Sequence, residues 1–434
     1  MSSIAQIAET LQTVWTQEAD RLGRETGFIQ RQVKWCGGTF LRTLVLGFLS
    51  NPEASYSELS QSAVALGVNI SSQGLEQRFT ETAVAFVHRV LEVMVTQVIC
   101  TSHNPFPVLD SFRGVYIRDS SVIALPRSLQ EVWRGVGGTA GETAALKLQV
   151  NLDFQTGQVH GPVLQNGRAH DQTSPFQTEC LPVGALHLAD LGYFSLDRLA
   201  TDQAEGVLWI TRLKLGTSLY GPDDQRLELV RWLPDHHAAL VDAQVSLGEK
   251  HRLPCRLIAV RVSQEVADRR RQALKEWARK KQKPISAERL KLAEWTVVVT
   301  NIPDERLPAQ QVLTLLRVRW QVELLFKLWK SHAKVDEWRS RNPWRILCEI
   351  YAKLIGLCLS QWLFVVSLWP YPDRSLFQAA KTVQKWAIPL ALALQDPDQL
   401  LATLTALCDC LMAGCRQQKR KTHAATFQQL LSLC

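Results

Sequence analysis

Three carboxylates in this chain stand in contexts that suit metal-dependent chemistry on phosphate. Asp119 follows a β-branched run in GVYIRDSSVIALP, Asp190 follows a short apolar run in ALHLADLGYF, and Glu323 lies within LRVRWQVELLFKLWK. Carboxylate oxygens are the ligands that Mg²⁺ prefers, and two such ions stabilise both the attacking and the leaving oxygen of a displacement at phosphorus. Because the three residues lie far apart in the sequence, only the fold can bring them together.

The stretch 316–330 predicts a buried helix that carries one charged stripe. At about 100° per residue, apolar side chains cover most of its circumference, and the remaining stripe contains a carboxylate between cations. The stripe consists of Leu316, Arg319, Glu323, Lys327 and Lys330. Isolated charges are costly in an apolar interior, so the stripe requires ion pairs, a metal or a phosphate opposite it. A purely structural salt-bridge network is the alternative interpretation.

The two aspartates are each predicted at the end of a β-strand. In open α/β sheets, ligands usually bind outside the carboxyl ends of the strands, which favours a shared site. A turn or helix N-cap role for each aspartate is the alternative. Two further runs, 145–154 and 158–163, flank Thr156 and Gly157 and predict a β-hairpin.

The rest of the chain predicts helical regions around this mixed core. Residues 55–80 resemble a helix-turn-helix, in which Gln73, Glu76, Gln77 and Arg78 would face a DNA groove, although such hairpins are also ordinary packing units. Strand-like runs between 207 and 300 are interrupted by a charged helix at 267–291. Its basic residues suit a phosphate backbone or simply a solvated surface. Beyond residue 330 the pattern is helical.

Length, composition and charge limit the classes of protein to which this chain can belong. The 434 residues, 46% hydrophobic and 21% charged, are typical of a globular chain with two or three domains, and the net charge of +8 is compatible with a polyanionic partner. Ten cysteines without a secretory signal predict free thiols in a reducing cytoplasm. The spacing of Cys408, Cys410, Cys415 and His423 disfavours zinc. The apolar window 354–369 is too short to span a membrane and predicts a buried helix.

Taken together, these segments resemble the DDE transposases of the insertion-sequence-four type over residues 30–365. Three blocks carry the resemblance: YIRDSSVIALP, LADLGYFSLDRL, and a signature of tyrosine, two residues, arginine, three residues, glutamate, six residues and lysine. Arg319, Glu323 and Lys330 match that signature, whereas Leu316 occupies the tyrosine position and so removes a hydroxyl that would contact DNA phosphate. Each block alone would be a weak signal.

The resemblance implies an α/β fold with a ribonuclease-H-like catalytic core and a β-rich insertion, flanked by helical regions at both ends. It divides the chain into a helical DNA-binding region (1–100), the first part of the core (101–206), the insertion with its basic helix (207–296), the second part of the core with the glutamate helix (297–365) and a C-terminal helical region (366–434).

The resemblance also implies roles for individual residues. Asp119, Asp190 and Glu323 would hold two Mg²⁺ ions, for which Mn²⁺ can substitute, and Arg319, Lys330 and Lys327 would contact DNA. Trp295 and Trp320 match tryptophans that hold a flipped base during hairpin formation, with ordinary core packing as the alternative for each. His170 and Asp171 are candidates to border the site or are plain loop residues.

The implied activity is cut-and-paste transposition of an insertion sequence. A metal-activated water cleaves the transposon end, the freed 3′-OH closes a hairpin on the opposite strand, and the reopened end is transferred into target DNA. The expected partners are double-stranded DNA, as terminal inverted repeats and target, and a second copy of the chain in a synaptic dimer, within the cytoplasm of a prokaryote and at its nucleoid, without a membrane. The alternatives are a ribonuclease-H-fold nuclease and an inactive, domesticated protein that binds transposon ends.

Overall fold

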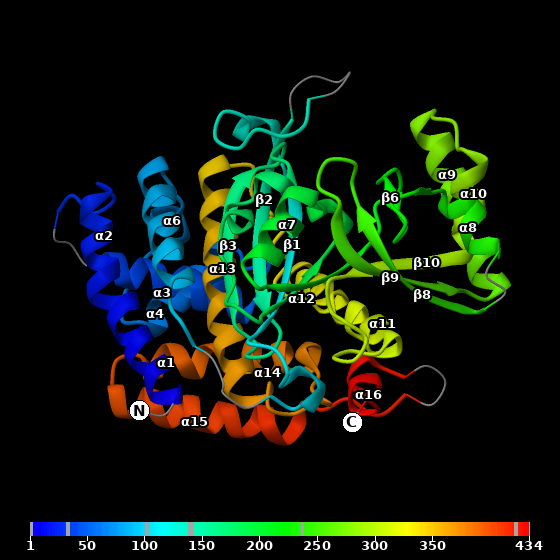
Figure 1. The fold of residues 1–434 in the computed structure, drawn as a ribbon. Coiled ribbons are helices and arrows are strands. Elements are labelled where there is room, and N and C mark those ends of the chain that lie inside the picture. Colours follow the sequence, from blue (N-terminus) through cyan, green and yellow to red (C-terminus); the bar gives the residue numbers. More distant parts are fainter. Residues whose placement is uncertain are drawn as a thin grey trace.

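A mixed β-sheet flanked by helices forms the centre of the molecule (Figure 1). The computed structural model describes residues 3–31, 35–99, 104–137, 143–235, 238–420 and 424–433. Within these ranges the sheet has ten strands in the order β3-β2-β1-β4-β5-β10-β9-β8-β6-β7. Its first half contains β1 (Val115–Leu125), β2 (Ala144–Asp153), β3 (Val159–Asn166), β4 (Leu186–Ala189) and β5 (Leu208–Arg212). An α/β fold is thereby confirmed, and β2 and β3 form the predicted hairpin.

Strand β1 is central to this half of the sheet. It pairs antiparallel with β2 along its length and parallel with β4, with Ile117 opposite Leu188. The prediction that Asp119 ends a strand is wrong, because β1 continues to Leu125. Ser120 and Ser121 resemble a turn in sequence, but β2 offers backbone partners beyond them, and the paired backbone therefore stays extended.

The outer half of the sheet is antiparallel and follows β5 without a break. It contains β10 (Trp295–Thr300), β9 (Leu253–Arg261), β8 (Leu240–Leu247), β6 (Leu219–Tyr220) and β7 (Arg226–Leu227), accompanied by α7 (Leu196–Ala204) and α8 (Leu229–Asp235). The charged helix predicted at 267–291 is two helices, α9 (Gln264–Lys281) and α10 (Ala287–Lys291). Gln282 in the left-handed conformation, followed by Pro284, ends the first of them.

Helices from both ends of the chain pack into one bundle beside the first half of the sheet (Figure 1). The N-terminal helices are α1 (Ser3–Gln12), α2 (Ala19–Glu25), α3 (Gly37–Ser50), α4 (Tyr56–Ala65), α5 (Ser72–Glu76) and α6 (Glu81–Val95), with a π-helical turn at Thr13–Glu18. The C-terminal helices of the bundle are α13 (Pro343–Ser367), α14 (Leu376–Ala393) and α15 (Pro397–Gly414), whereas α16 (Thr426–Leu431) lies apart from them and contacts α11 (Ala309–Val318). Helix α3 contacts α13 and α14, and α1 contacts α15. One continuous hydrophobic core joins these helices to β1 and β2.

The predicted helix-turn-helix consists of α4 and α5. Helix α5 is only five residues long and ends at Glu76, so Gln77 and Arg78 lie beyond it. Helix α13 is the one helix in the described ranges that is long and apolar enough to cross a membrane, and 94% of its most apolar window is buried inside the protein. The prediction that 354–369 lies in a buried helix agrees with this placement.

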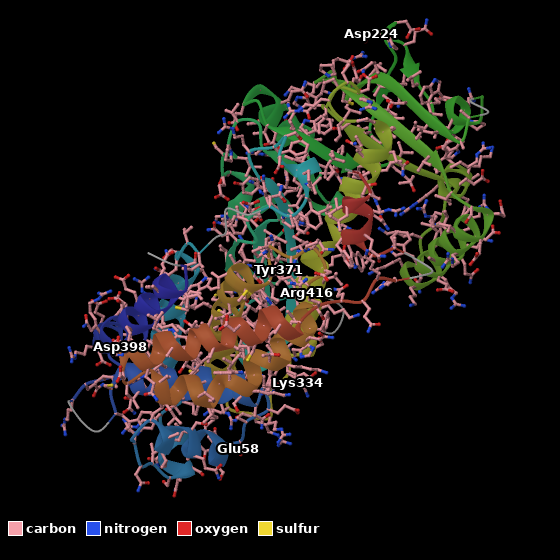
Figure 2. The ribbon with its side chains drawn as sticks, turned by 90° about the horizontal axis from the view of Figure 1, so that it is seen from below. Glu58, Asp224, Lys334, Tyr371, Asp398 and Arg416 are labelled. Carbon is pink, nitrogen blue, oxygen red and sulfur yellow. The ribbon has the colours of Figure 1, made fainter. Side chains whose placement is uncertain are left out.

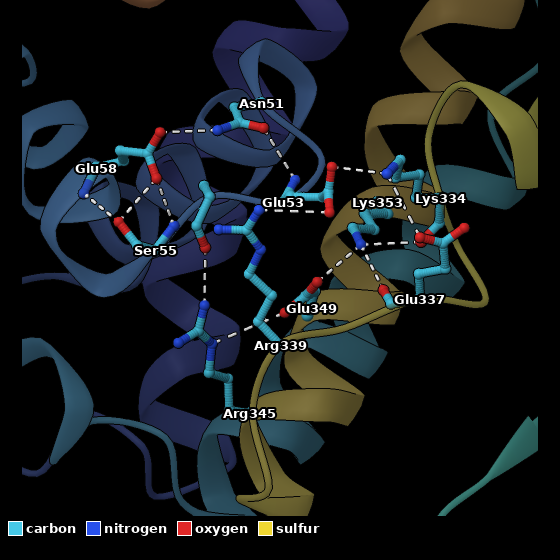
Figure 3. A network of polar contacts seen from close by, with 11 residues as sticks. Asn51, Glu53, Ser55, Glu58, Lys334, Glu337, Arg339, Arg345, Glu349 and Lys353 are labelled. Atoms are coloured by element: carbon cyan, nitrogen blue, oxygen red, sulfur yellow. Dashed lines mark hydrogen bonds and ion pairs between the residues drawn. The ribbon is translucent and has the colours of Figure 1, made fainter.

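A network of buried and half-buried charges connects the α3–α4 turn, the segment after the glutamate helix and α13 (Figure 3). Lys334 pairs with Glu53 at 2.6 Å, and Lys353 pairs with Glu349 at 2.7 Å. The molecule is elongated: Glu58, beside this network, and Asp224, in the outer half of the sheet, lie at opposite ends (Figure 2). The network thus anchors the helical end of the molecule to the core.

The helix predicted over 316–330 is two consecutive helices, α11 (Ala309–Val318) and α12 (Trp320–Ser331). Arg319 lies between them with φ −50° and ψ −33°, so the chain keeps a helical direction. The backbone N–H of Arg319 donates to the carbonyl of Leu316, and the N–H of Val322 donates to the carbonyl of Arg319. Each of these hydrogen bonds joins residues three apart, whereas an α-helix joins residues four apart. The apolar side of α12 is buried as predicted, and the charged stripe lies near β1.

Candidate active site

Asp119 and Asp190 lie at the same level of the sheet on neighbouring parallel strands. Ile117 is paired with Leu188. Asp119 lies two residues after Ile117, and Asp190 lies two residues after Leu188. Because side chains alternate across a strand, Asp119 shares a face with Ile117, which packs in the core that contains α12 residues. Asp190 comes directly after β4 and precedes a short 3₁₀ turn, Leu191–Tyr193. The parallel pairing therefore brings the two carboxylates together.

Arg319 joins the second aspartate to the glutamate. Its Nη1 lies 3.3 Å from Asp190 Oδ1, and its Nη2 lies 2.7 Å from Glu323 Oε1. The Arg319 side chain is only 12% exposed, whereas both carboxylates are about one third exposed, at 34% and 31%. A guanidinium that bridges two carboxylates offsets their mutual repulsion, so Arg319 takes part in the charge balance of the cluster.

The carboxyl group of Asp119 has a perturbed pKa. Burial is the main cause that raises this pKa to about 7; the charges of Asp190 and Glu323 also raise it, and the Ser120 backbone N–H and Arg319 lower it. The backbone N–H of Ser120 donates to Asp119 Oδ1 at 2.8 Å. The cluster therefore holds more negative charge than Arg319 alone balances, which favours an additional cation.

The donor set suits a hard divalent cation, although the carboxylates are not gathered around a vacant point. Within the part of the chain that the structure describes, no three His, Cys, Asp or Glu side chains are placed to hold one metal ion. Arg319 takes the position between Asp190 and Glu323. Carboxylate oxygens alone suit Mg²⁺ or Mn²⁺. In this arrangement the Arg319 guanidinium is the cation that balances Asp190 and Glu323.

The predicted lysines occupy the outer part of α12. Lys330 Nζ donates to the carbonyl of Val122 on β1 at 3.1 Å, so the side chain presently reaches back to the strand that carries Asp119. Lys327 is exposed. Both residues lie on the helix that carries Glu323, and neither forms an ion pair within the described ranges.

The two predicted tryptophans have opposite environments. Trp295 is 6% exposed and packs in the hydrophobic cluster of the outer sheet, with the Arg261 guanidinium 4.8 Å from its ring. The core-packing interpretation therefore applies to Trp295 in this arrangement. Trp320 is 53% exposed and stands directly after Arg319 at the start of α12. Of the two rings, Trp320 is the one available to a DNA base.

A second polar cluster supports β1 from its opposite face. Ser120 Oγ donates to Asp171 Oδ1 at 2.7 Å, and Lys147 Nζ pairs with the same oxygen at 3.1 Å. Asp171 therefore borders the site through the residue next to Asp119, while His170 is exposed. Sequence reasoning missed Lys147, which looks like an ordinary strand residue; a lysine that is only 9% exposed needs a partner, but burial is not visible in sequence.

The cysteine cluster near the C-terminus has no metal-binding geometry among the described residues. Cys408 and Cys415 are buried and Cys410 is exposed, because neighbouring residues of α15 point in different directions. His423 lies outside the described residues.

The raised pKa of Asp119 predicts how stability depends on pH without divalent cations. The folded chain keeps a proton on Asp119 up to about pH 7, whereas the unfolded chain releases it near the ordinary aspartate pKa of 3.8. Unfolding therefore releases a proton, and the free energy of unfolding should fall as pH rises from about 4 to about 7. Each pKa unit is worth about 1.4 kcal/mol, so the fall should reach a few kcal/mol.

The measurement is urea unfolding with a chelator at several pH values, comparing the protein with Asp119→Asn. Asparagine cannot ionise, so the variant should lack this component and become more stable than the parent above pH 7. Parallel curves for the two proteins across this range would contradict a raised pKa at Asp119.

With this geometry established, comparisons with known proteins identify the relatives. Residues 110–359, which include Asp119, Asp190 and Glu323, match the family model described as transposase DDE domain. The chain is 30% identical, over 96% of its length and 92% of the relative, to the transposase for insertion sequence element IS231F of Bacillus thuringiensis subsp. israelensis. It is 31% identical to the IS231C transposase of subsp. berliner, over 78% of this chain and 75% of that protein.

A more distant relative shows similar coverage. The transposase for insertion sequence element IS1151 of Clostridium perfringens is 25% identical over 81% of this chain and 78% of that protein. The family model alone spans more than half of the chain, and it includes β1, β4 and α12, the elements that bring the three carboxylates together. The chain belongs to the DDE transposase family of insertion sequences, enzymes that cleave and join DNA.

Proposed function

We propose that this protein excises an insertion sequence by a cut-and-paste reaction that depends on a divalent cation, and then joins its ends to target DNA. The observation that carries the proposal is the meeting of Asp119, Asp190 and Glu323 around Arg319, although these carboxylates lie far apart in sequence. Family membership supplies DNA as the substrate.

The catalytic core is proposed to have a ribonuclease-H-like fold. The strand order β3-β2-β1-β4-β5 supports this assignment, with three antiparallel strands followed by two that run parallel to β1. In this assignment β5 (Leu208–Arg212) belongs to the core, although it falls within the range 207–296 predicted for the insertion. The outer strands from β10 to β7 then form the β-rich insertion, which continues the same sheet.

In this proposal Asp119, Asp190 and Glu323 hold Mg²⁺ or Mn²⁺. When bound, the ions supply charge neutralisation at the phosphate and stabilise the attacking and leaving oxygens. Arg319, released from the two carboxylates, binds the DNA backbone beside the scissile phosphate, and Lys330 and Lys327 extend this contact along α12. Positioning and charge stabilisation are the main demands of phosphoryl transfer on a protein, and these residues meet them.

The reaction sequence uses one P–O bond exchange at each step. Water displaces the 3′-oxygen at the transposon end; the freed 3′-OH attacks the opposite strand and closes a hairpin; a second water reopens it; and the 3′-OH then attacks target DNA. Trp320 offers the exposed ring on which an unpaired base would stack during hairpin formation. Leu316, 7% exposed where the family signature has tyrosine, offers no hydroxyl to the backbone.

The proposed working form is a dimer bound to two terminal inverted repeats in the cytoplasm of a bacterium, at the nucleoid. The bacterial origin of the relatives supports the host. The α4–α5 pair, with exposed Gln73 and Glu76, is the proposed DNA-reading segment of the N-terminal helices.

A three-component reaction tests the proposal. Purified protein is incubated with end-bearing DNA, a target plasmid and Mg²⁺, and the products are separated on denaturing gels. We expect end cleavage, a hairpin species and joined product. Cleavage without joined product would indicate a nuclease, and binding of the repeats without nicking would indicate an end-binding protein; either result would refute the proposed function.

A further inference from the structure

A cavity lined by five arginines opens beside the candidate active site. Its volume is about 620 Å³, and it lies between the ends of β5 and β9, helix α9 and helix α11. The five arginines, which we call the arginine pocket, are Arg212, Arg261, Arg270, Arg317 and Arg319. The lining includes no aspartate or glutamate among the described residues. Sequence reasoning missed three of them, Arg212, Arg261 and Arg317, whereas Arg270 belongs to the basic helix predicted at 267–291. The alternation LRVRW, with Arg317 two residues before Arg319, was the available signal for Arg317.

Three of these guanidinium groups lack a counterion. Arg212, Arg261 and Arg317 are exposed, and within the described residues none of them forms an ion pair. Arg317 donates to the amide oxygen of Gln429 at 2.8 Å, and Arg261 lies over the Trp295 ring. These are neutral partners, so the positive charge of the pocket stays uncompensated.

Arg270 adds a fixed charge to the pocket. Its Nη1 donates to the carbonyl of Trp295 at 3.1 Å and its Nη2 to Thr296 Oγ1 at 2.9 Å, which hold the side chain in place. Burial and the nearby charge of Arg212 both lower its pKa, so like charges are held close together here. Like charges in proximity repel unless an anion lies between them, and arginine forks suit phosphate oxygens.

The arginine pocket is continuous with the catalytic cluster. Arg319 lines the pocket and also pairs with Asp190 and Glu323. Trp320, which is 53% exposed, lines the pocket next to Arg319. The cavity volume falls within the roughly 300–1,000 Å³ of sites that hold a small molecule. A space of this size admits a nucleotide or two of one strand and is too small for a double helix.

We propose that the arginine pocket binds a short single-stranded DNA segment adjacent to the phosphate on which Asp119, Asp190 and Glu323 act. The backbone phosphates of this segment pair with Arg212, Arg261 and Arg317. The identity of the anion as DNA rests on the proposed function. The pocket thereby requires the strands to separate next to the cleavage point.

Binding without catalysis tests this proposal. The full-length protein is titrated with a fluorescein-labelled oligothymidylate in a chelator, and the dissociation constant is measured against salt concentration. For single strands, each phosphate contact contributes about 0.7 to the slope of log affinity against log salt, so Arg212→Ala/Arg317→Ala should reduce the slope by about 1.4. Arg212→Lys/Arg317→Lys keeps both charges and should retain the slope.

Matched exposed arginines provide the control. Arg226 on β7 and Arg231 on α8 lie outside the cavity lining, so Arg226→Ala/Arg231→Ala should leave the slope unchanged. Equal slopes for the parent and the pocket variant, an equal loss in the control, or an equal loss on a fully paired duplex would each overturn the pocket assignment. Because no cleavage is scored, these outcomes are independent of the product assay that tests transposition.

Discussion

Asp190→Asn and Glu323→Gln are each expected to reduce DNA end cleavage by at least about 10²–10³-fold, as removal of a single preorganised charge-stabilising group does in other enzymes. Each substitution removes one proposed cation-binding carboxylate and one partner of Arg319, while the side-chain shape is nearly kept. The measurement is the single-turnover rate of cleavage on end-bearing DNA with Mg²⁺. DNA binding should persist, because the freed guanidinium gains access to phosphate.

Asp197→Asn is the matched control for this loss. Asp197 lies in the same stretch of chain as Asp190, is 84% exposed and pairs only with His251 among the described residues. The cleavage rate of this variant should stay within about twofold of the parental rate, because surface ion pairs have small effects. Cleavage at the parental rate by either active-site variant would remove that carboxylate from the proposed mechanism.

Glu349→Ala is expected to destabilise the protein by about 3–5 kcal/mol, the usual cost of removing one partner from a buried ion pair. Glu349 is 2% exposed and pairs with Lys353 at 2.7 Å and with Arg345 at 3.8 Å (Figure 3). Without it, two buried cations lose their only carboxylate partner among the described residues. Equilibrium unfolding in urea, followed by circular dichroism, measures the loss.

This substitution should also affect cleavage at elevated temperature. Lys353 donates to the carbonyls of Lys334 and Glu337, in the segment that follows the helix of Glu323, and Arg345 donates to the carbonyl of Ala54. The network thus holds the segment that follows α12 against α13 and the α3–α4 turn (Figure 3). We expect thermal inactivation to shift to lower temperature together with unfolding.

Glu337→Gln is the control for the network. Glu337 is 59% exposed and pairs with Lys334 at 3.4 Å, so its loss should cost less than about 1 kcal/mol. If Glu349→Ala destabilised the protein no more than Glu337→Gln, the charges at Glu349, Lys353 and Arg345 would not act as a buried structural network.

Much of the local structure around the site is predictable from the sequence. The two strand-like runs on either side of Thr156 and Gly157 predict the hairpin of β2 and β3, and the apolar periodicity of 316–330 predicts which side of α12 is buried, because these patterns reflect local geometry. The extent of β1 is not predictable in the same way. Whether Ser120 and Ser121 form a turn or stay extended depends on β2, which pairs with them only after folding.

The environments of the aromatic and basic residues depend on tertiary structure for a similar reason. Trp295 and Trp320 are equivalent as sequence signals, yet one packs inside the outer sheet and the other stands in solvent beside Arg319. The five arginines of the arginine pocket come from two strands, two helices and the residue between α11 and α12, so no spacing in the sequence predicts the pocket. Long-range packing decides burial, and burial decides which of these side chains can meet DNA.

The sequence by itself determined the order and chemical type of the three carboxylates, the apolar patterns of the elements that carry them, and membership of the DDE transposase family. Only the tertiary structure decided that Asp119 lies inside a strand at the level of Asp190, and that Arg319 bridges Asp190 and Glu323. The physical reason is that residue type and periodicity are local properties of the chain. Strand register and charge proximity arise only when distant segments share one core.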